Sequence, residues 1–212
     1  MILKLDRAGN TLYDGRGRRF VASERTWAET GPEEAVAVPL EALTPDAAVA
    51  WLQRDSGRPL RAPIGVVGPR SASAAQLETA EALGAGLAGL GLTVLCGGRE
   101  GVMEAVCRGV ASAGGLSVGL LPDDSWTAAN PYVTLPLATG LGVARNAVVA
   151  RAAVCLLAVG GGHGTTSEMA FALQFGRPVL ALDDAPDLPG VVRVGSVEDA
   201  LAVLCEQLLG LR

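Results

Sequence analysis

The chain has 212 residues, enough for one domain with a sizeable core but too few for two ordinary domains. Half of the residues are apolar and only 18% are charged, which excludes intrinsic disorder. The net charge is −5 and no run of basic residues occurs, so neither a nucleic-acid-binding surface nor a surface for anionic membranes is expected.

The apolar segments and the cysteines indicate a soluble, cytoplasmic protein. No apolar stretch reaches the roughly 20 residues of a membrane span without Gly, Pro or charge. The N-terminus reads as a strand and not as a signal peptide. Four scattered cysteines form no CxxC pair, so we expect small buried residues in a reducing compartment. They are Cys96, Cys107, Cys155 and Cys205.

Two residue types are nearly absent, and this limits the chemistry. His163 is the only histidine, so a multi-histidine metal site is impossible and we predict no metal site. Lys4 is the only lysine and lies in the N-terminal segment. An enzyme that anchors pyridoxal phosphate through a lysine imine is therefore not expected.

The first 60 residues differ from the rest of the chain. Residues 2–14, with a Gly-Asn turn signal, and residues 15–22 predict a short antiparallel hairpin. Residues 39–51 predict a small helix, with Thr44 and Pro45 at its start. We expect residues 1–60 to be an N-terminal appendage that precedes a domain formed by residues 61–212.

From residue 64 onward, short apolar strands alternate with helices. Strands are predicted at 64–68, 92–96, 116–121, 132–137, 154–159 and 178–182. Helices are predicted at 73–90, 101–113, 143–152, 166–175 and 197–209. This alternation is typical of a Rossmann-like α/β fold, a doubly wound parallel sheet of six or seven strands with helices on both faces.

Two glycine clusters lie where a predicted strand runs into a helix. The first is Cys-Gly-Gly-Arg-Glu-Gly-Val-Met-Glu at 96–104, and the second is Val-Gly-Gly-Gly-His-Gly-Thr-Thr-Ser-Glu at 159–168. Glycines let backbone N–H groups approach an anion, and a helix N-terminus adds partial positive charge. Tight strand–helix turns also use glycine for purely structural reasons, but two such loops in one sheet favour a phosphate site. Neither is a Walker A loop, because no GK[ST] follows.

These loops resemble the signatures of the LOG (Lonely Guy) family, whose members are also labelled lysine decarboxylases. The second loop is similar to the family's PGGxGTxxE pattern, with Gly160 in place of the proline. The first loop is similar to its GGxxGxM segment. The resemblance covers about residues 62–183, and the segments 140–146 and 160–165 look closer to the DprA-related and molybdenum-cofactor-carrier branch than to plant-type LOG enzymes.

The resemblance implies a two-residue catalytic site, and the two glycine loops, with the segment after the strand at 64–68, supply a set of predicted ligand contacts. Arg145 and Glu168 match the family's catalytic arginine and glutamate, although Asn146 stands where the enzymes carry lysine. Such a pair would cleave a nucleoside 5′-monophosphate through an oxocarbenium-like transition state. The predicted ligand- and phosphate-binding residues are Gly68, Arg70, Ser71, Gly97, Gly98, Gly101, Met103, Gly161, Gly162, His163, Gly164, Thr165 and Thr166.

Three functions stay open from the sequence. The first is a phosphoribohydrolase, the second a non-catalytic carrier of molybdenum cofactor, and the third a nucleotide sensor. We predict no required cofactor, with a nucleoside monophosphate or molybdenum cofactor as the bound small molecule. The predicted partners are this small molecule and further copies of the chain, as a homodimer or higher homo-oligomer, because the helices at 101–113 and 143–152 are rich in small apolar residues.

Overall fold

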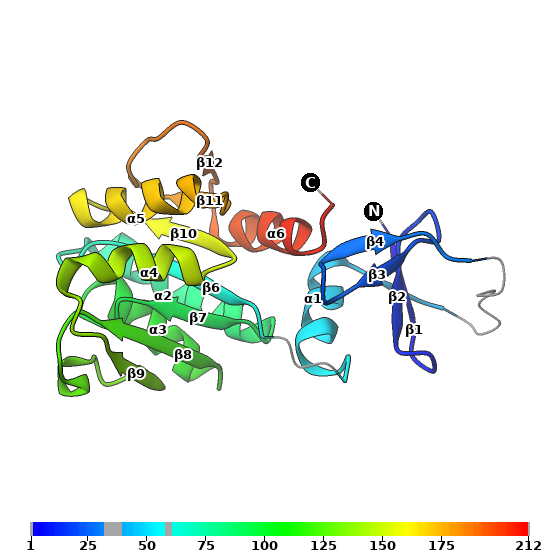
Figure 1. Cartoon of the computed structure of the whole chain (residues 1–212), viewed down its shortest axis with the longest axis horizontal. Helices are drawn as coiled ribbons and strands as arrows, with labels where there is room; N and C mark the ends of the chain where they lie inside the picture. Colours follow the sequence, from blue (N-terminus) through cyan, green and yellow to red (C-terminus); the bar gives the residue numbers. More distant parts are fainter. Residues whose placement is uncertain (1, 32–39, 58–60, 212) are drawn as a thin grey trace. The chain divides into compact units, whose positions relative to one another are not determined.

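The structure is a computed structural model and describes residues 2–31, 40–57 and 61–211. Its chain divides into two compact units, Met1–Arg61 with Leu201–Arg212, and Ala62–Ala200 (Figure 1). Compactness alone does not define an independently folding domain, so the division into domains 1–60 and 61–212 stays a prediction. None of the helices in the described ranges is both long and apolar enough to cross a membrane.

The smaller unit contains a five-stranded antiparallel sheet with the order β4-β3-β2-β1-β5. Its strands are β1 (Leu3–Asp6), β2 (Thr11–Tyr13), β3 (Arg19–Val21), β4 (Thr26–Ala28) and β5 (Glu41–Leu43). The predicted hairpin is present as β1 and β2, with Leu5 opposite Leu12. The indole N–H of Trp27 donates a 2.7 Å hydrogen bond to the Leu209 carbonyl and so ties the C-terminal residues to this sheet. The appendage is thus larger than a hairpin.

The helix predicted at 39–51 was placed too early. Pro39 lies outside the described residues, residues 41–43 form β5, and helix α1 spans Pro45–Arg54. Proline at the first helical position loses no hydrogen bond, and it disfavours a helical residue before it, so the helix begins at Pro45. Strand β5 is stabilised by its long-range pairing with β1, which no local pattern indicates.

The larger unit contains a seven-stranded sheet with the order β12-β11-β10-β6-β7-β8-β9, in which every neighbouring pair is parallel. This confirms the predicted Rossmann-like sheet. Its strands are β6 (Pro63–Val67), β7 (Thr93–Cys96), β8 (Leu116–Leu121), β9 (Leu135–Ala138), β10 (Cys155–Val159), β11 (Val179–Leu182) and β12 (Val192–Arg193). The residues of β7, β10 and β11 are all buried, as expected for strands covered on both faces.

Helices cover both faces of this sheet (Figure 1). On one face α2 (Ala74–Gly89) packs against α3 (Val102–Ser112), and on the other α4 (Arg145–Ala152) packs against α5 (His163–Gln174). Helix α6 (Val197–Leu208) follows β12, and its residues from Leu201 onward belong to the smaller unit. Two 3-10 turns, η1 (Trp126–Ala128) and η2 (Gly142–Ala144), lie in the connections on either side of β9.

The strand order reverses beside β6. The chain proceeds outward from β6 through β7 and β8 to β9, and then crosses to β10 on the other side of β6. The connections after β6 and β10 therefore lead away from each other and leave a crevice at the carboxyl ends of these strands. Ligands of doubly wound proteins bind in this place.

Candidate functional site

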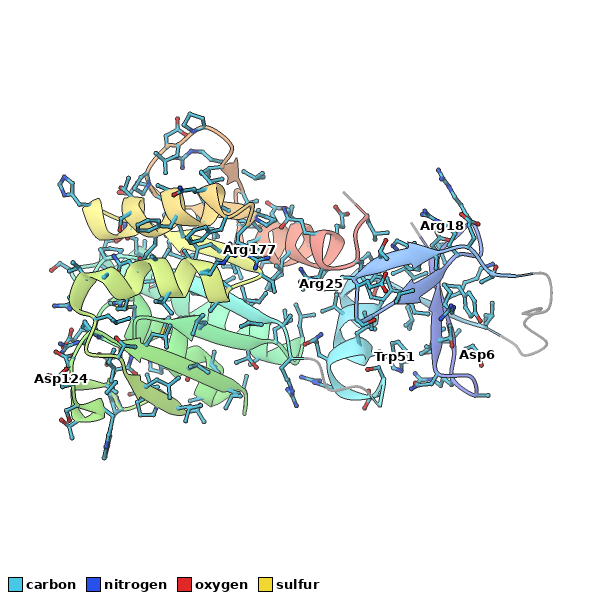
Figure 2. All side chains as sticks on the ribbon, in the orientation of Figure 1. Asp6, Arg18, Arg25, Trp51, Asp124 and Arg177 are labelled. Atoms are coloured by element: carbon cyan, nitrogen blue, oxygen red, sulfur yellow. The ribbon has the colours of Figure 1, made fainter. Side chains whose placement is uncertain are left out.

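A cavity of about 270 Å³ lies at the carboxyl edge of the larger sheet. Figure 2 shows Asp124, from the loop after β8, and Arg177, which precedes β11, at opposite ends of the larger unit, and the Asp124 end is the carboxyl edge. The lining residues are Val67, Gly68, Pro69, Arg70, Gly97, Met103, Pro122, Gly142, Val143, Arg145, Asn146, Gly162, Gly164, Thr165 and Glu168.

A buried ion pair forms part of the cavity wall. Arg145 is the first residue of α4, and its Nη1 donates a 2.9 Å hydrogen bond to Oε1 of Glu168 on α5. Only 9% and 8% of the two side chains are exposed. Packing of α4 against α5 brings together two residues that are 23 positions apart. The structure therefore places the two predicted catalytic residues in direct contact at the cavity.

Burial raises the pKa of the Glu168 carboxyl to about 7, and Arg145 opposes that shift by its charge and its hydrogen bond. Desolvation dominates because the charged carboxylate loses its hydration in this dry position. Near neutral pH, Glu168 therefore exchanges a proton, whereas an ordinary glutamate is fully charged. A carboxyl whose pKa is shifted by desolvation and by a specific charged partner in a cavity is a candidate functional group.

Asn146 holds the arginine in place. The Asn146 Oδ1 accepts a 2.8 Å hydrogen bond from Arg145 Nη1, and its Nδ2 donates at 3.0 Å to the hydroxyl of Ser167. The Ser167 hydroxyl in turn donates at 2.7 Å to the Gly164 carbonyl. These three hydrogen bonds connect the start of α4 to the start of α5. A lysine at position 146 has no acceptor atom and would repel the arginine at this point.

The N-terminus of α5 is open toward the cavity. Its N-cap is Gly162, no side chain caps it, and the N–H groups of the first turn have no helical acceptor. A Cβ added at Gly162 or Gly164 would meet no atom within 4 Å, so these glycines leave space for a ligand. Such a helix end attracts anions through its N–H groups and its partial positive charge.

Only one of the three hydroxyls in this turn is available for a ligand. The Thr166 and Ser167 hydroxyls donate to the carbonyls of Gly162 and Gly164. Thr165 lines the cavity, and its hydroxyl has no hydrogen-bond partner among residues 2–31, 40–57 and 61–211. Thr165 is therefore the hydroxyl donor that can face a phosphate.

Gly160 explains the departure from the PGGxGT pattern. Its φ is +58°, which proline cannot adopt because its ring holds φ near −65°. A Cβ at this position would also collide with the amide of Gln76, which donates a 2.6 Å hydrogen bond to Asp184. The loop thus leaves β10 along a path that is specific to glycine.

The predicted contacts fall into two groups. Those that line the cavity are Gly68, Arg70, Gly97, Met103, Gly162, Gly164 and Thr165. The others do not line it. Three of them are glycines that face protein atoms: Gly98 lies near Gly119, Gly101 near the Arg70 carbonyl and Gly161 near Thr165. His163 is exposed, the Thr166 hydroxyl donates to the Gly162 carbonyl, and Ser71 lines a neighbouring cavity. The binding roles of both groups stay predictions.

Sequence reasoning missed part of the wall. Pro122 follows β8, Gly142 and Val143 belong to η2 after β9, and none of the three was among the predicted ligand contacts. Asn146 was noted only as a departure from a motif, although it contacts the arginine directly. Within the described ranges, no three His, Cys, Asp or Glu side chains lie close enough together to hold a metal ion.

Two proteins of solved structure and one further protein sequence are similar to this chain over most of their own length. The molybdenum cofactor binding protein of Rippkaea orientalis is 33% identical, with a TM-score of 0.67 over 70% of this chain and 98% of that one. The molybdenum cofactor carrier protein of Chlamydomonas reinhardtii is 36% identical, with a TM-score of 0.65 over 71% and 99%. An uncharacterised protein of Archaeoglobus fulgidus is 35% identical over 65% of this chain and 91% of its own length.

A more distant likeness concerns the fold alone. The DNA processing protein A of Helicobacter pylori, whose binding mode for single-stranded DNA has been described, is 15% identical with a TM-score of 0.53. The sequence model of the SLOG cluster4 family matches residues 61–203 of this chain. All residues that line the cavity lie within this range. This agrees with the LOG-like resemblance of the two glycine loops, and the chain belongs to the SLOG cluster4 family.

Proposed function

We propose that this protein binds a phosphorylated, nucleotide-like molecule in the cavity and carries it without cleaving it, with the pterin of the molybdenum cofactor as its cargo. The proposal is supported by the similarity to a molybdenum cofactor binding protein and a molybdenum cofactor carrier protein, both of which match over nearly their whole length. It is also supported by the charge of the wall, which has two guanidinium groups, those of Arg70 and Arg145, and one carboxylate, that of Glu168.

The ligand's phosphate is expected at the start of α5. Gly162 and Gly164 leave room for it, the free N–H groups of the first turn point there, and the Thr165 hydroxyl adds a donor. The apolar side chains of Val67, Met103 and Val143 provide a wall for a flat ring system. The site thus offers charge for the phosphate and apolar surface for the ring.

The observation that carries the choice of a carrier is the buried contact between Glu168 and Arg145. A carboxylate that stabilises an oxocarbenium ion must be charged and must face the ribose. In this protein one oxygen of Glu168 accepts a hydrogen bond from Arg145, and burial raises the pKa of the carboxyl, which disfavours the charged form that this step needs. We infer that Arg145 and Glu168 hold the ligand.

A phosphoribohydrolase is the second candidate. It is favoured by the fact that Arg145 and Glu168 both line the cavity, as the catalytic pair of a hydrolase must. The free oxygen of Glu168 would then act on the ribose.

The test measures binding and turnover on the same samples. The protein is purified from a host that makes molybdenum cofactor and examined by native mass spectrometry, and it is also mixed with nucleoside 5′-monophosphates and assayed by calorimetry and by chromatography of free base. We expect a bound pterin or nucleotide and no base release. Base release that disappears in Glu168→Gln would establish the hydrolase, and the absence of any bound ligand would reject both functions.

A further inference from the structure

A second cavity of about 290 Å³ adjoins the first one. Both cavities are lined by Arg70, in the loop between β6 and α2. The second is also lined by Ser71, Leu77, Gly101, Glu104 and Arg108. Arg70 therefore forms part of the wall of both cavities.

The start of α3 separates the two cavities. The Val102 N–H donates a 3.1 Å hydrogen bond to the Pro69 carbonyl, and Gly101, with a φ of +72°, lies so close to the Arg70 carbonyl that no side chain fits there. Met103 then lines the first cavity, whereas Glu104 lines the second. The loop and the helix thus hold Arg70 at the boundary.

Arg70 is the cation that is available at this boundary. Its side chain is exposed and forms no hydrogen bond or ion pair within the described part of the chain. The other two arginines of the cavities are already paired, Arg145 with Glu168 at 2.9 Å and Arg108 with Glu81 at 2.7 Å. An anionic group that reaches both cavities would therefore meet an unpaired guanidinium.

We propose that the second cavity binds the second half of the ligand. The ligand class would be a dinucleotide-like molecule in which a pyrophosphate, held between the start of α5 and Arg70 on the wall of the first cavity, joins two organic groups. This proposal rests on the proposed function, since the first half occupies the first cavity. In the second cavity, Leu77 offers an apolar surface for a ring, and Glu104 and Ser71 offer polar groups for the amino and hydroxyl groups of a base or sugar.

The experiment compares adenosine 5′-monophosphate with P1,P2-diadenosine 5′-diphosphate by calorimetry on the full chain. A charge-assisted contact with Arg70 should lower the Kd of the diphosphate at least about tenfold relative to the monophosphate. Arg70→Ala should remove most of this difference. Ser71→Trp, an exposed position that fills the second cavity, should raise the Kd of the diphosphate to that of the monophosphate.

Arg193→Ala is the matched control, because Arg193 lies on the edge strand β12 and lines neither cavity. It should leave both values of Kd unchanged, with circular dichroism confirming that all variants are folded. Two results would overturn the role of the second cavity in binding and leave the proposed function intact. One is equal Kd values for the two ligands in the parent, and the other is a preference for the diphosphate that remains in Ser71→Trp. Absence of binding by either nucleotide would overturn the dinucleotide-like ligand, whereas the proposed function would fall only if native mass spectrometry also found no bound pterin or nucleotide.

Discussion

At the scale of single residues, the cavity depends on groups that are removed from water. Arg145 and Glu168 are both buried, so each stabilises the other's charge, and neither can lose its partner without leaving a buried charge uncompensated. Desolvation nevertheless dominates at Glu168 and raises its pKa to about 7. The protonation of one carboxyl therefore links the stability of the fold to pH.

The first prediction concerns this linkage. Because the pKa of Glu168 is raised from 4.5 to about 7, the folded protein binds more protons than the unfolded chain between these values, and stability falls as pH rises. From pH 5 to pH 8, this residue should lower the free energy of unfolding by roughly 2 kcal/mol. Urea unfolding of the parent and of Glu168→Gln at both pH values measures it. An identical pH dependence in the two proteins would contradict the raised pKa.

The second prediction separates ligand contacts from structure in the α5 turn. Gly164→Val adds a side chain into open space in the first turn of a helix, so the fold should be retained. The same side chain occupies the place of an approaching phosphate, so the Kd for adenosine 5′-monophosphate should rise at least about tenfold.

Gly89→Val is the control, because Gly89 ends α2 at the other edge of the sheet and its Cβ would also meet nothing within 4 Å. Thermal unfolding should give similar values of Tm for both variants, and only Gly164→Val should lose affinity. A Gly164→Val variant that binds as tightly as the parent would show that the loop serves only the fold.

At the scale of elements, α4 carries out two tasks on different faces. Its first turn supplies Arg145 and Asn146 to the cavity. Another face of α4 forms a largely apolar hollow with Phe175, which follows α5. The α4 residues that line this hollow are Ala147, Val148, Arg151 and Ala152. An apolar helix face outside the core is typical of an interface between subunits.

The third prediction is that the protein is a homodimer or larger and that α4 contributes to the interface. Val148→Asp places a charge on the apolar face and should shift the sedimentation coefficient at micromolar concentration toward that of a 21.5 kDa monomer. Val192→Asp on β12 is the control, since Val192 is 41% exposed and Val148 is 39% exposed. A parent protein that sediments only as a monomer would refute the prediction.

At the scale of the whole molecule, net charge bears on whether the protein binds nucleic acid. The net charge is −5, and the fold alone is shared with the DNA processing proteins, at 15% and 19% identity. Binding of nucleic acid requires a basic surface that replaces counterions along the phosphates.

The fourth prediction is therefore that the protein does not bind single-stranded DNA. A fluorescein-labelled 20-nucleotide DNA should show no change in anisotropy at protein concentrations up to about 10 µM in 50 mM salt, a condition under which electrostatic binding is favoured. A DNA processing protein A serves as the positive control. A salt-sensitive rise in anisotropy would contradict the prediction and would point to a DNA function.

The sequence by itself determined the class of the fold and the two glycine loops that meet at the cavity. The alternation of apolar strands and helices after residue 63 is a local pattern, and each glycine loop lies between a strand and a helix, so the parallel sheet and the edge that carries the site followed from short segments. The resemblance to LOG proteins added Arg145 and Glu168, and the structure places this pair on the cavity wall.

Only the tertiary structure decided which groups meet. The Asn146 contact with Arg145, the wall formed by Val143, and the second cavity around Arg70 arise from packing between elements that are distant in sequence. The five-stranded sheet of the smaller unit was missed for the same reason, because β5 depends on long-range pairing with β1. Local patterns record the propensities of a segment, whereas burial, which sets the charge state of Glu168, depends on every element that surrounds it.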